Sequence, residues 1–239
     1  HNDNLLIAGC GLTGDVIIDL DKTPHILIGG NTGSGKTVLL RCLLWQAIQQ
    51  SDIVYIADFK GGVDFGRLWH RFAHIITNEK DLLELLNRLV DELEERKKLF
   101  IEADSYNIKD YFSKNKQYLN RIIFSCDEVA ELLDKTGADK ERKELLSQIE
   151  ARLSTLARQG RAFGIHLVLA TQRPDANILP GQIKNNLNVR ICGRADATLS
   201  TIIIGDGRAA EQIPSDAQGR FIMDNGTVFQ AYYFDDSLI

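Results

Sequence analysis

One eight-residue segment constrains the fold of this chain more than any other, the glycine-rich run GNTGSGKT at residues 30–37. It matches the phosphate-loop pattern GxxxxGK[ST] at every position, and it lies between an apolar run at 25–28 and a helical pattern at 37–49. Glycines allow the tight turn that directs backbone N–H groups and a helix N-terminus at phosphate oxygens. The segment therefore predicts a nucleotide site on a strand–loop–helix unit.

The side chains of this loop have distinct expected roles. Lys36 is expected to reach the β- and γ-phosphates, and Thr37 to offer its hydroxyl to Mg²⁺. A flexible glycine turn without a ligand is the alternative interpretation, which the flanking strand and helix disfavour. The residues predicted to bind ATP are Gly30, Asn31, Thr32, Gly33, Ser34, Gly35, Lys36, Thr37 and Val38.

Short runs rich in Ile and Val alternate with long helical patterns, which is typical of parallel strands covered by helices. The predicted strands are 25–28, 53–57, 74–76, 121–125, 165–170 and 189–192. Apolar residues recur at helical spacing at 82–93 and at 145–156, and we interpret both stripes as core packing.

Both ends of the chain have the pattern of antiparallel pairs. The runs 219–223 and 227–233 flank Asp224-Asn225-Gly226, a strong turn signal, so we predict a terminal hairpin. Near the start, 4–8 is expected to pair with 16–19 around a turn at 9–15. We expect one domain over 1–239, comprising a β region at 1–20, a core at 21–215 and a hairpin at 219–233.

The amino-acid composition excludes few classes of protein. A chain of 239 residues that is 44% hydrophobic can bury a full core. Its formal net charge of -5 shows no broad positive excess for nucleic acid, although a pore needs only a few basic side chains. The four cysteines are far apart, which favours neither zinc nor disulfides and fits a reducing compartment. No apolar run is long enough to span a bilayer, and a start at His1 suggests a fragment.

A second motif follows the apolar run at 122–126, where Asp127 and Glu128 stand side by side. We expect Asp127 to hold Mg²⁺ and Glu128 to act as the general base on the attacking water. Adjacent acids after a strand are also typical of an ordinary helix start. The phosphate loop upstream favours the catalytic interpretation.

A third motif is the run LVLATQRP at 167–174, a predicted buried strand that ends in polar residues. Ligands of open parallel sheets bind at the carboxyl ends of strands, so Thr171 and Gln172 are expected near the γ-phosphate. Gln172 is the candidate sensor of hydrolysis. A strand that merely stops before Pro174 is the alternative.

Other nucleotide enzymes fit less well. Guanine selection needs an Asn-Lys-x-Asp segment, and Asn115-Lys116-Gln117 is followed by Tyr118. The tandem acids favour ATP hydrolysis over a GTP switch. Adenylate kinase-like transfer is disfavoured because no acceptor lid is recognisable.

Four blocks resemble the motor domain of the FtsK/SpoIIIE family of P-loop ATPases, which pump double-stranded DNA. They are PHILIGGNTGSGKT, IIFSCDEVAELL, ARQGRAFGIHLVLATQRP and ILPGQIKNNLNVRI, and they span most of residues 20–215. The third is the most specific, because phosphate loops are widespread. The resemblance implies an α/β fold with a three-layer RecA-like core and a mainly parallel sheet. It also implies a ring hexamer whose ATP sites are shared between subunits.

The resemblance assigns roles to arginines and a lysine outside these strands. Arg161 matches an arginine that acts in trans on the γ-phosphate of a neighbour, with Arg158 as the fallback. A cation stabilising its own helix end is the alternative for Arg161. Arg173 and Lys184 match the region facing the pore, and plain surface charges are an equal alternative.

Two departures weaken a role in chromosome segregation. The segment ADFKGG at 57–62 is more similar to the type VII secretion ATPases than to the chromosome pumps, and a winged-helix module has no counterpart before Ile239. A conjugative coupling protein and a protein-secretion ATPase remain. A degenerate nucleotide-binding module is disfavoured because Lys36, Asp127 and Glu128 are all intact.

The resemblance also suggests cofactors, partners and a location. ATP and Mg²⁺ are the expected cofactors, and double-stranded DNA, further copies of the chain and channel proteins are the expected partners. We expect the protein at the cytoplasmic face of a bacterial membrane, held there by segments outside this sequence.

Overall fold

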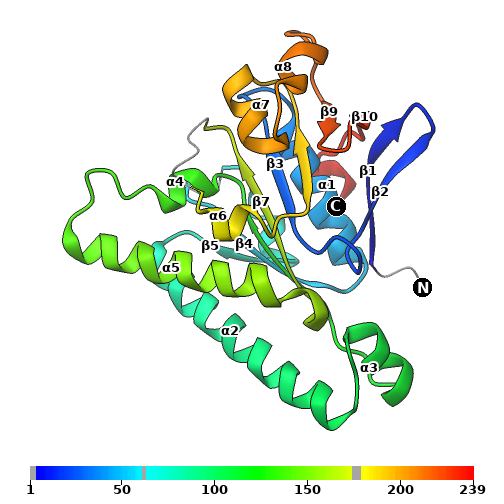
Figure 1. Cartoon of the computed structure of the whole chain (residues 1–239), viewed down its shortest axis with the longest axis vertical. Coiled ribbons are helices and arrows are strands. Elements are labelled where there is room, and N and C mark those ends of the chain that lie inside the picture. Colours follow the sequence, from blue (N-terminus) through cyan, green and yellow to red (C-terminus); the bar gives the residue numbers. More distant parts are fainter. Residues whose placement is uncertain (1–3, 61–62, 174–178) are drawn as a thin grey trace.

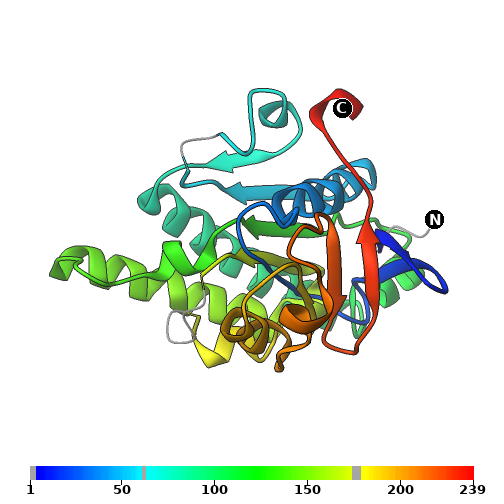
Figure 2. The ribbon, with the colours of Figure 1, turned by 90° about the horizontal axis from the view of Figure 1, so that it is seen from above.

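The computed structural model describes residues 4–60, 63–173 and 179–239, and these residues build one continuous ten-stranded sheet (Figure 1). The strand order is β2-β1-β10-β9-β8-β3-β7-β6-β4-β5. Helices lie on both faces of the sheet, as the view from above shows (Figure 2). The predicted three-layer α/β fold with a mainly parallel core sheet is therefore confirmed.

Six neighbouring strands form the parallel part of the sheet. They are β3 (Ile26–Gly29), β4 (Ile53–Ala57), β5 (His74–Ile76), β6 (Ile122–Cys126), β7 (Ile165–Thr171) and β8 (Val189–Cys192). Every residue of β3, β6 and β7 is buried, as expected for parallel strands covered on both faces. All six predicted strands are confirmed to within one residue at each end.

The remaining strands are antiparallel and extend the same sheet beyond β8. They are β9 (Arg220–Met223), β10 (Val228–Ala231), β1 (Leu5–Gly11) and β2 (Gly14–Asp19). The predicted terminal hairpin is confirmed, with Phe229 opposite Phe221 and a positive φ of 89° at Gly226 in its turn. That φ favours glycine because other residues meet a steric clash there.

The pairing predicted near the start is also confirmed, but the turn is much shorter than expected. The β1–β2 ladder runs from Leu5 opposite Asp19 to Gly11 opposite Gly14, with a register shift between Ile7 and Gly9. A β-bulge absorbs the extra residue, so the two strands continue through most of the region 9–15 that the sequence predicted as turn.

One helix covers one face of the sheet and packs against its strand β1. This helix, α1 (Lys36–Gln49), buries Leu39, Leu40 and Leu43 in a core shared with the N-terminal strands. The short helix η1 (Trp69–Arg71) adds Trp69 to the same core.

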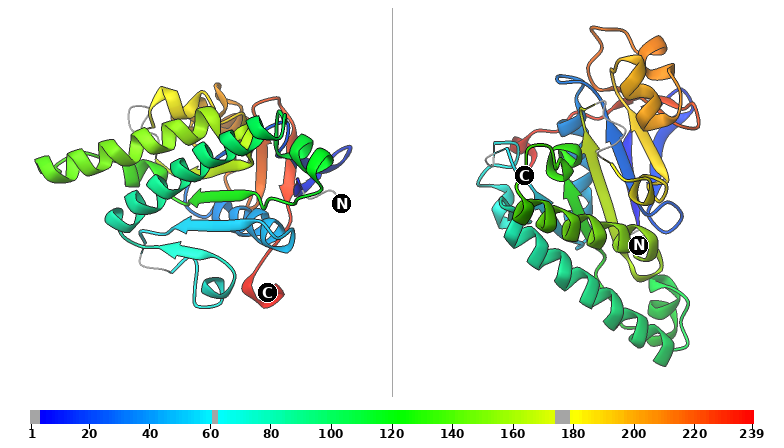
Figure 3. Two further views of the ribbon diagram at one scale, coloured as in Figure 1. Left: turned by 90° about the horizontal axis from the view of Figure 1, so that it is seen from below. Right: turned by 60° about the vertical axis from the view of Figure 1, so that its left-hand side comes forward.

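Two long helices, α2 (Glu79–Glu102) and α5 (Lys140–Gln159), lie side by side on the opposite face (Figure 3). Their predicted apolar stripes face the second core: Leu82, Leu86, Leu89, Leu93, Ile149, Leu153 and Leu156 are buried, and Leu145 is half-buried. The side chain of Asn78 caps α2 by accepting a hydrogen bond from the N–H of Asp81.

The shorter helices complete this face and the ends of the molecule. They are α3 (Ile108–Asn115), α4 (Val129–Leu133), α6 (Gly181–Lys184), α7 (Ala197–Ile204), α8 (Arg208–Gln212), η2 (Arg161–Phe163) and η3 (Asp236–Leu238). Every helix in the described part of the chain is too short or too polar to cross a bilayer.

Candidate nucleotide site at one edge of the sheet

The phosphate loop joins β3 to α1 at the carboxyl edge of the parallel strands. Its glycines have positive φ angles, 156° at Gly30, 77° at Gly33 and 94° at Gly35. A Cβ on Gly35 would lie 2.9 Å from the backbone nitrogen of Gly219, so both the angle and the space require glycine there. The loop therefore leaves its backbone N–H groups at the start of α1, where the helix dipole favours an anion.

A pocket of about 480 Å³ opens over this loop. It is lined by residues 31–38, which are the predicted ATP-binding residues apart from Gly30, together with Lys60, Asp64 and Gln172. A larger hollow of about 740 Å³ lies between the starts of α2 and α5, where Arg142 and Glu79 form an ion pair 2.8 Å apart. We place the candidate site at the smaller pocket because only this one is lined by the phosphate loop.

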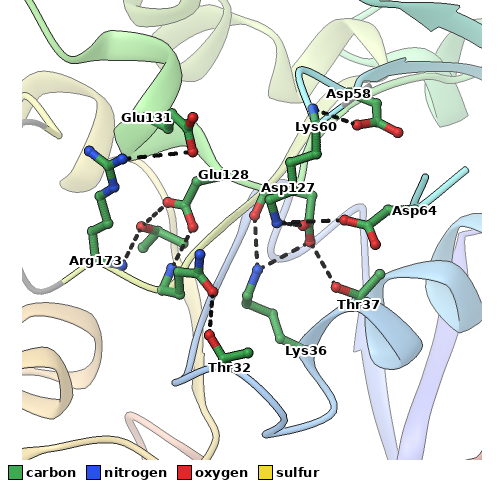
Figure 4. A network of polar contacts seen from close by, with 12 residues as sticks. Thr32, Lys36, Thr37, Asp58, Lys60, Asp64, Asp127, Glu128, Glu131 and Arg173 are labelled. Carbon is green, nitrogen blue, oxygen red and sulfur yellow. Dashed lines mark hydrogen bonds and ion pairs between the residues drawn. The ribbon is translucent and has the colours of Figure 1, made fainter. Parts of the chain in front are cut away.

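Asp127 follows β6 directly and is held by residues of the phosphate loop (Figure 4). The Nζ of Lys36 donates to the backbone oxygen of Asp127 at 2.9 Å and lies 3.1 Å from its Oδ1. The hydroxyl of Thr37 donates to the same Oδ1 at 3.3 Å. The two predicted Mg²⁺ residues, Thr37 and Asp127, are thus neighbours in space although 90 residues separate them.

The carboxylate of Asp127 is buried yet ionised. Burial raises its pKa, but the charge of Lys36 and the hydrogen bond and charge of Lys60 outweigh burial, so the pKa lies below its ordinary value of 3.8. Hard oxygen donors from Thr37 and Asp127 suit Mg²⁺. The two ammonium groups already at this carboxylate show that the place stabilises positive charge.

Glu128 is oriented by the end of the neighbouring strand β7. Its Oε1 accepts a hydrogen bond of 2.6 Å from the hydroxyl of Thr171, and its Oε2 accepts one of 2.9 Å from the backbone N–H of Gln172. The side chain of Glu128 is buried. Both oxygens keep a lone pair for a further donor, because each carboxylate oxygen accepts two hydrogen bonds.

Gln172 connects Glu128 to the phosphate loop. Its Oε1 accepts a hydrogen bond of 3.0 Å from the hydroxyl of Thr32, while its backbone N–H is bound to Glu128. The ends of β3, β6 and β7 therefore meet at one place. The residues predicted from three separate motifs lie there in two hydrogen-bonded groups, one around Asp127 and one around Glu128, which follow each other in the sequence. Pro174 and Ile178, which the sequence blocks include, lie outside the described residues.

Arg161 lies at the other edge of the sheet, far from both groups. Its Nε donates to the backbone oxygen of Asp21 at 3.3 Å, and the seven residues of β7 separate it from Gln172. At about 3.3 Å per residue, that strand spans roughly 20 Å. The structure therefore does not bring Arg161 to the site of its own chain. Arg158 likewise points elsewhere, with its Nε bound to the backbone oxygen of Ser154.

The two residues matched to a pore region have local partners. Arg173 pairs with Asp134 at 3.2 Å and lies 3.8 Å from Glu131. Lys184 lies on α6, where burial and then the charge of Arg190 lower the pKa of its ammonium. These contacts fit the surface-charge interpretation of Arg173 as well as a pore role.

Sequence reasoning assigned no role to two basic residues at this edge. Lys60, which follows β4, donates to Oδ2 of Asp127 at 2.6 Å. Arg194, which follows β8, donates to the backbone oxygen of Thr32 at 2.9 Å and supports the phosphate loop. The rule that ligands bind beyond the carboxyl ends of parallel strands was the available signal, because both residues follow predicted strands.

Fold and site together define a P-loop nucleotide-binding protein of the RecA-like type. The FtsK/SpoIIIE family model matches residues 9–176, which is more than half of the chain. The chain belongs to the FtsK/SpoIIIE family.

Relatives and solved structures agree with this assignment. The DNA translocase FtsK of Campylobacter jejuni subsp. jejuni is 33% identical over 220 residues, which cover 87% of this chain and 22% of that protein. The FtsK of Treponema pallidum is also 33% identical and covers 87% of this chain. The chain thus spans about a quarter of the length of these relatives.

Two solved structures are similar over nearly the whole chain. The pCW3 conjugation coupling protein TcpA, a monomer form with ATPγS, has a TM-score of 0.93 at 46% identity and covers 99% of this chain and 68% of its own. The type VII secretion ATPase EccC of Thermomonospora curvata has a TM-score of 0.77 at 25% identity, over 99% of this chain and 29% of its own.

Proposed function

We propose that this chain is the ATP-hydrolysing motor domain of a DNA pump that serves conjugative or related DNA transfer. The observation that carries the proposal is the meeting of Lys36, Asp127, Glu128 and Gln172 beside the phosphate loop. The similarity to the conjugation coupling protein at 46% identity over 99% of the chain supports transfer as the process.

The residues of this site have different roles in ATP binding and hydrolysis. The phosphate loop binds the triphosphate through backbone N–H groups, and Lys36 neutralises its β- and γ-oxygens. When bound, Mg²⁺, held by Thr37 and Asp127, offsets the charge of the triphosphate.

Glu128 accepts the proton of the water that attacks the γ-phosphorus, while the bond from that phosphorus to the departing ADP oxygen breaks. Thr171 and Gln172 fix the carboxylate in the orientation that this proton transfer needs. Gln172, bound to both Glu128 and Thr32, is placed to report the loss of the γ-phosphate to the rest of β7.

Arg161 acts on the site of a neighbouring subunit in this proposal. Its guanidinium, exposed at the edge opposite the phosphate loop, stabilises charge on the γ-phosphate only when a second copy docks there. Hydrolysis then depends on assembly, which fits a ring, for which we propose six copies. DNA is the polymer moved, and anchorage at a membrane comes from segments outside this sequence.

A protein-secretion motor of the type VII kind is the second candidate, favoured by the similarity to EccC over 99% of the chain. The two candidates respond to different polymers. We expect ATP turnover of the assembled protein to rise with protein concentration and to rise further with double-stranded DNA. Stimulation by the tail of a secreted protein, with no response to DNA, would favour the second candidate instead.

A further inference from the structure

The segment after β4 carries a cation into the nucleotide site. Asp58 is fixed at the strand end because its backbone N–H donates to the oxygen of Ile76 on β5. The Oδ1 of Asp58 accepts a hydrogen bond of 3.0 Å from the backbone N–H of Lys60, which turns the chain toward the phosphate loop. Asp58 is 2% exposed, so the start of this turn is fixed in the core, while Lys60 at its end reaches the surface.

The ammonium of Lys60 lies at the carboxylate expected to hold Mg²⁺ (Figure 4). Its Nζ is 2.6 Å from Oδ2 of Asp127 and 3.5 Å from the carboxylate of Asp64. Lys36 lies at the other oxygen, Oδ1, at 3.1 Å. The carboxylate of Asp127 thus has two ammonium neighbours, and it shares one of them, Lys60, with Asp64.

The two lysines differ in what a nucleotide does to them. Lys36 belongs to the phosphate loop and gains phosphate oxygens as partners. Lys60 also lines the 480 Å³ pocket, but its Nζ lies at Oδ2 of Asp127, beside the Oδ1 that the hydroxyl of Thr37 contacts. A Mg²⁺ ion held by Thr37 and Asp127 would lie close to this ammonium, and like charges so close together repel each other.

We propose that Lys60 is an internal counter-ion of Asp127 that is displaced from the carboxylate when Mg²⁺ arrives with a nucleotide. The segment that Asp58 anchors then has one set of partners in the nucleotide-free protein and another in the loaded one. A purely structural ion pair is the competing interpretation, and it predicts no link between Lys60 and Mg²⁺. The inference rests on nucleotide binding at the phosphate loop, which is part of the proposed function.

The test is a thermodynamic cycle measured by ADP binding in MgCl₂ and in EDTA, using isothermal titration calorimetry. The quantity compared is the ratio of the Kd in EDTA to the Kd in MgCl₂. In Lys60→Met the ratio is expected to rise by about threefold to tenfold. Without Lys60, Asp127 repels the phosphates more strongly in EDTA, which raises that Kd, and binds Mg²⁺ without competition, which lowers the Kd in MgCl₂. Both changes raise the ratio.

Two further variants make the result specific. Lys60→Arg keeps the positive charge and is expected to keep the ratio near that of the unaltered protein. Lys135→Met removes a similarly exposed lysine that lies away from the site, where its Nζ is 2.8 Å from the carboxylate of Glu150. This variant is expected to leave the ratio unchanged.

Equal ratios in Lys60→Met and the unaltered protein would overturn the proposal, as would a rise in Lys60→Arg as large as that in Lys60→Met. Failure of the unaltered protein to bind ADP in MgCl₂ would instead contradict the proposed function on which the inference rests.

Discussion

The two edges of the parallel sheet differ in the burial and the partners of their charged residues. At the carboxyl edge, Lys36, Asp127 and Glu128 are buried and bound to groups far away in the sequence. At the amino edge, Arg161 is exposed and makes one long hydrogen bond to the backbone of Asp21. A charge held by several partners is already positioned within the chain, whereas an exposed arginine is free to serve a partner. The comparison fits our proposal that the residues of the carboxyl edge are positioned within one chain and that the amino edge acts on a neighbouring copy.

Two buried histidines lie in the interior of the amino edge. His25 and His166 are buried there, and their Nδ1 atoms are hydrogen-bonded to the N–H of Leu167 and the oxygen of Pro24. Burial lowers the pKa of His25 to about 4, and it lowers that of His166 well below the ordinary range. Both imidazoles are therefore uncharged at neutral pH, beside the buried guanidinium groups of Arg121 and Arg96.

The largest effect is expected at the carboxyl edge, where two substitutions separate ATP binding from ATP hydrolysis. Lys36→Ala removes the charge that contacts the phosphates, so tight ATP binding is lost. Glu128→Gln keeps binding but lowers turnover by roughly 10³-fold, because the amide cannot accept the proton of the attacking water. Nucleotide titration measures the ATP affinity of each variant, and single-turnover hydrolysis measures its rate of catalysis. Equal losses of ATP affinity in both variants would show that Glu128 has another role.

A smaller effect is expected from the group that orients Glu128. Thr171→Val keeps the shape of the side chain but removes the hydroxyl that donates to Oε1 of Glu128 at 2.6 Å. Turnover is expected to fall by roughly tenfold with little change in ATP affinity, as a charge-assisted hydrogen bond of this kind is lost.

The matched control for that substitution is Thr155→Val on α5, where the hydroxyl donates to a helix carbonyl away from the site. It should leave turnover unchanged. A loss of ATP affinity in Thr171→Val that equals the loss of turnover would contradict a positioning role.

The dependence of stability on pH also distinguishes the two edges. The unfolded chain protonates His25 near its ordinary pKa of 6.5, and the folded chain does so near 4, so the stabilisation is complete above pH 6.5 and is lost as the pH falls toward 4. His25 alone should lower the free energy of unfolding by an amount on the order of 3 kcal/mol over that window, and His166 lowers it further in the same direction. The contribution of Asp127 persists until the pH falls below its ordinary value of 3.8.

Urea unfolding between pH 7 and 4 measures this difference. His25→Asn keeps an acceptor for the N–H of Leu167 but cannot be protonated, so its stability should fall less steeply over the window. An identical slope in this variant would assign the pH dependence to other groups.

Much of the carboxyl edge could be predicted because each motif is local. The phosphate loop, the paired acids and Gln172 each follow an apolar run that predicts its own strand, and the structure places them side by side. Lys60 and Arg194 could not be assigned in the same way. Their contacts depend on which strands are neighbours in the sheet, and the sequence pattern does not specify that β4 lies beside β6 or β8 beside β3.

The fold was predictable to a similar extent. Apolar periodicity located all six parallel strands, yet it did not show that the terminal hairpin and the first two strands continue the same sheet. That continuity depends on backbone pairing between β1 and β10, whose partners are more than 200 residues apart. Gly9 makes it possible, because a Cβ there would lie 2.1 Å from the backbone oxygen of Gln230.

The central claim is that the amino edge of one subunit completes the carboxyl edge of another. Arg161→Ala should keep ATP affinity near normal but slow turnover of the assembled protein by about 10³-fold or more. Mixing the Arg161→Ala and Glu128→Gln variants creates subunit interfaces at which an intact Glu128 of one copy faces an intact Arg161 of its neighbour.

The decisive measurement is the ATP turnover of that mixture, with co-assembly verified by sedimentation. The control is a mixture of Glu128→Gln with the double variant Glu128→Gln/Arg161→Ala, which has no intact base at any subunit interface. Recovery of hydrolysis in the first mixture but not in the control is the predicted result. No recovery in co-assembled rings would contradict catalysis in trans and leave Arg161 as a cation that stabilises the end of its own helix.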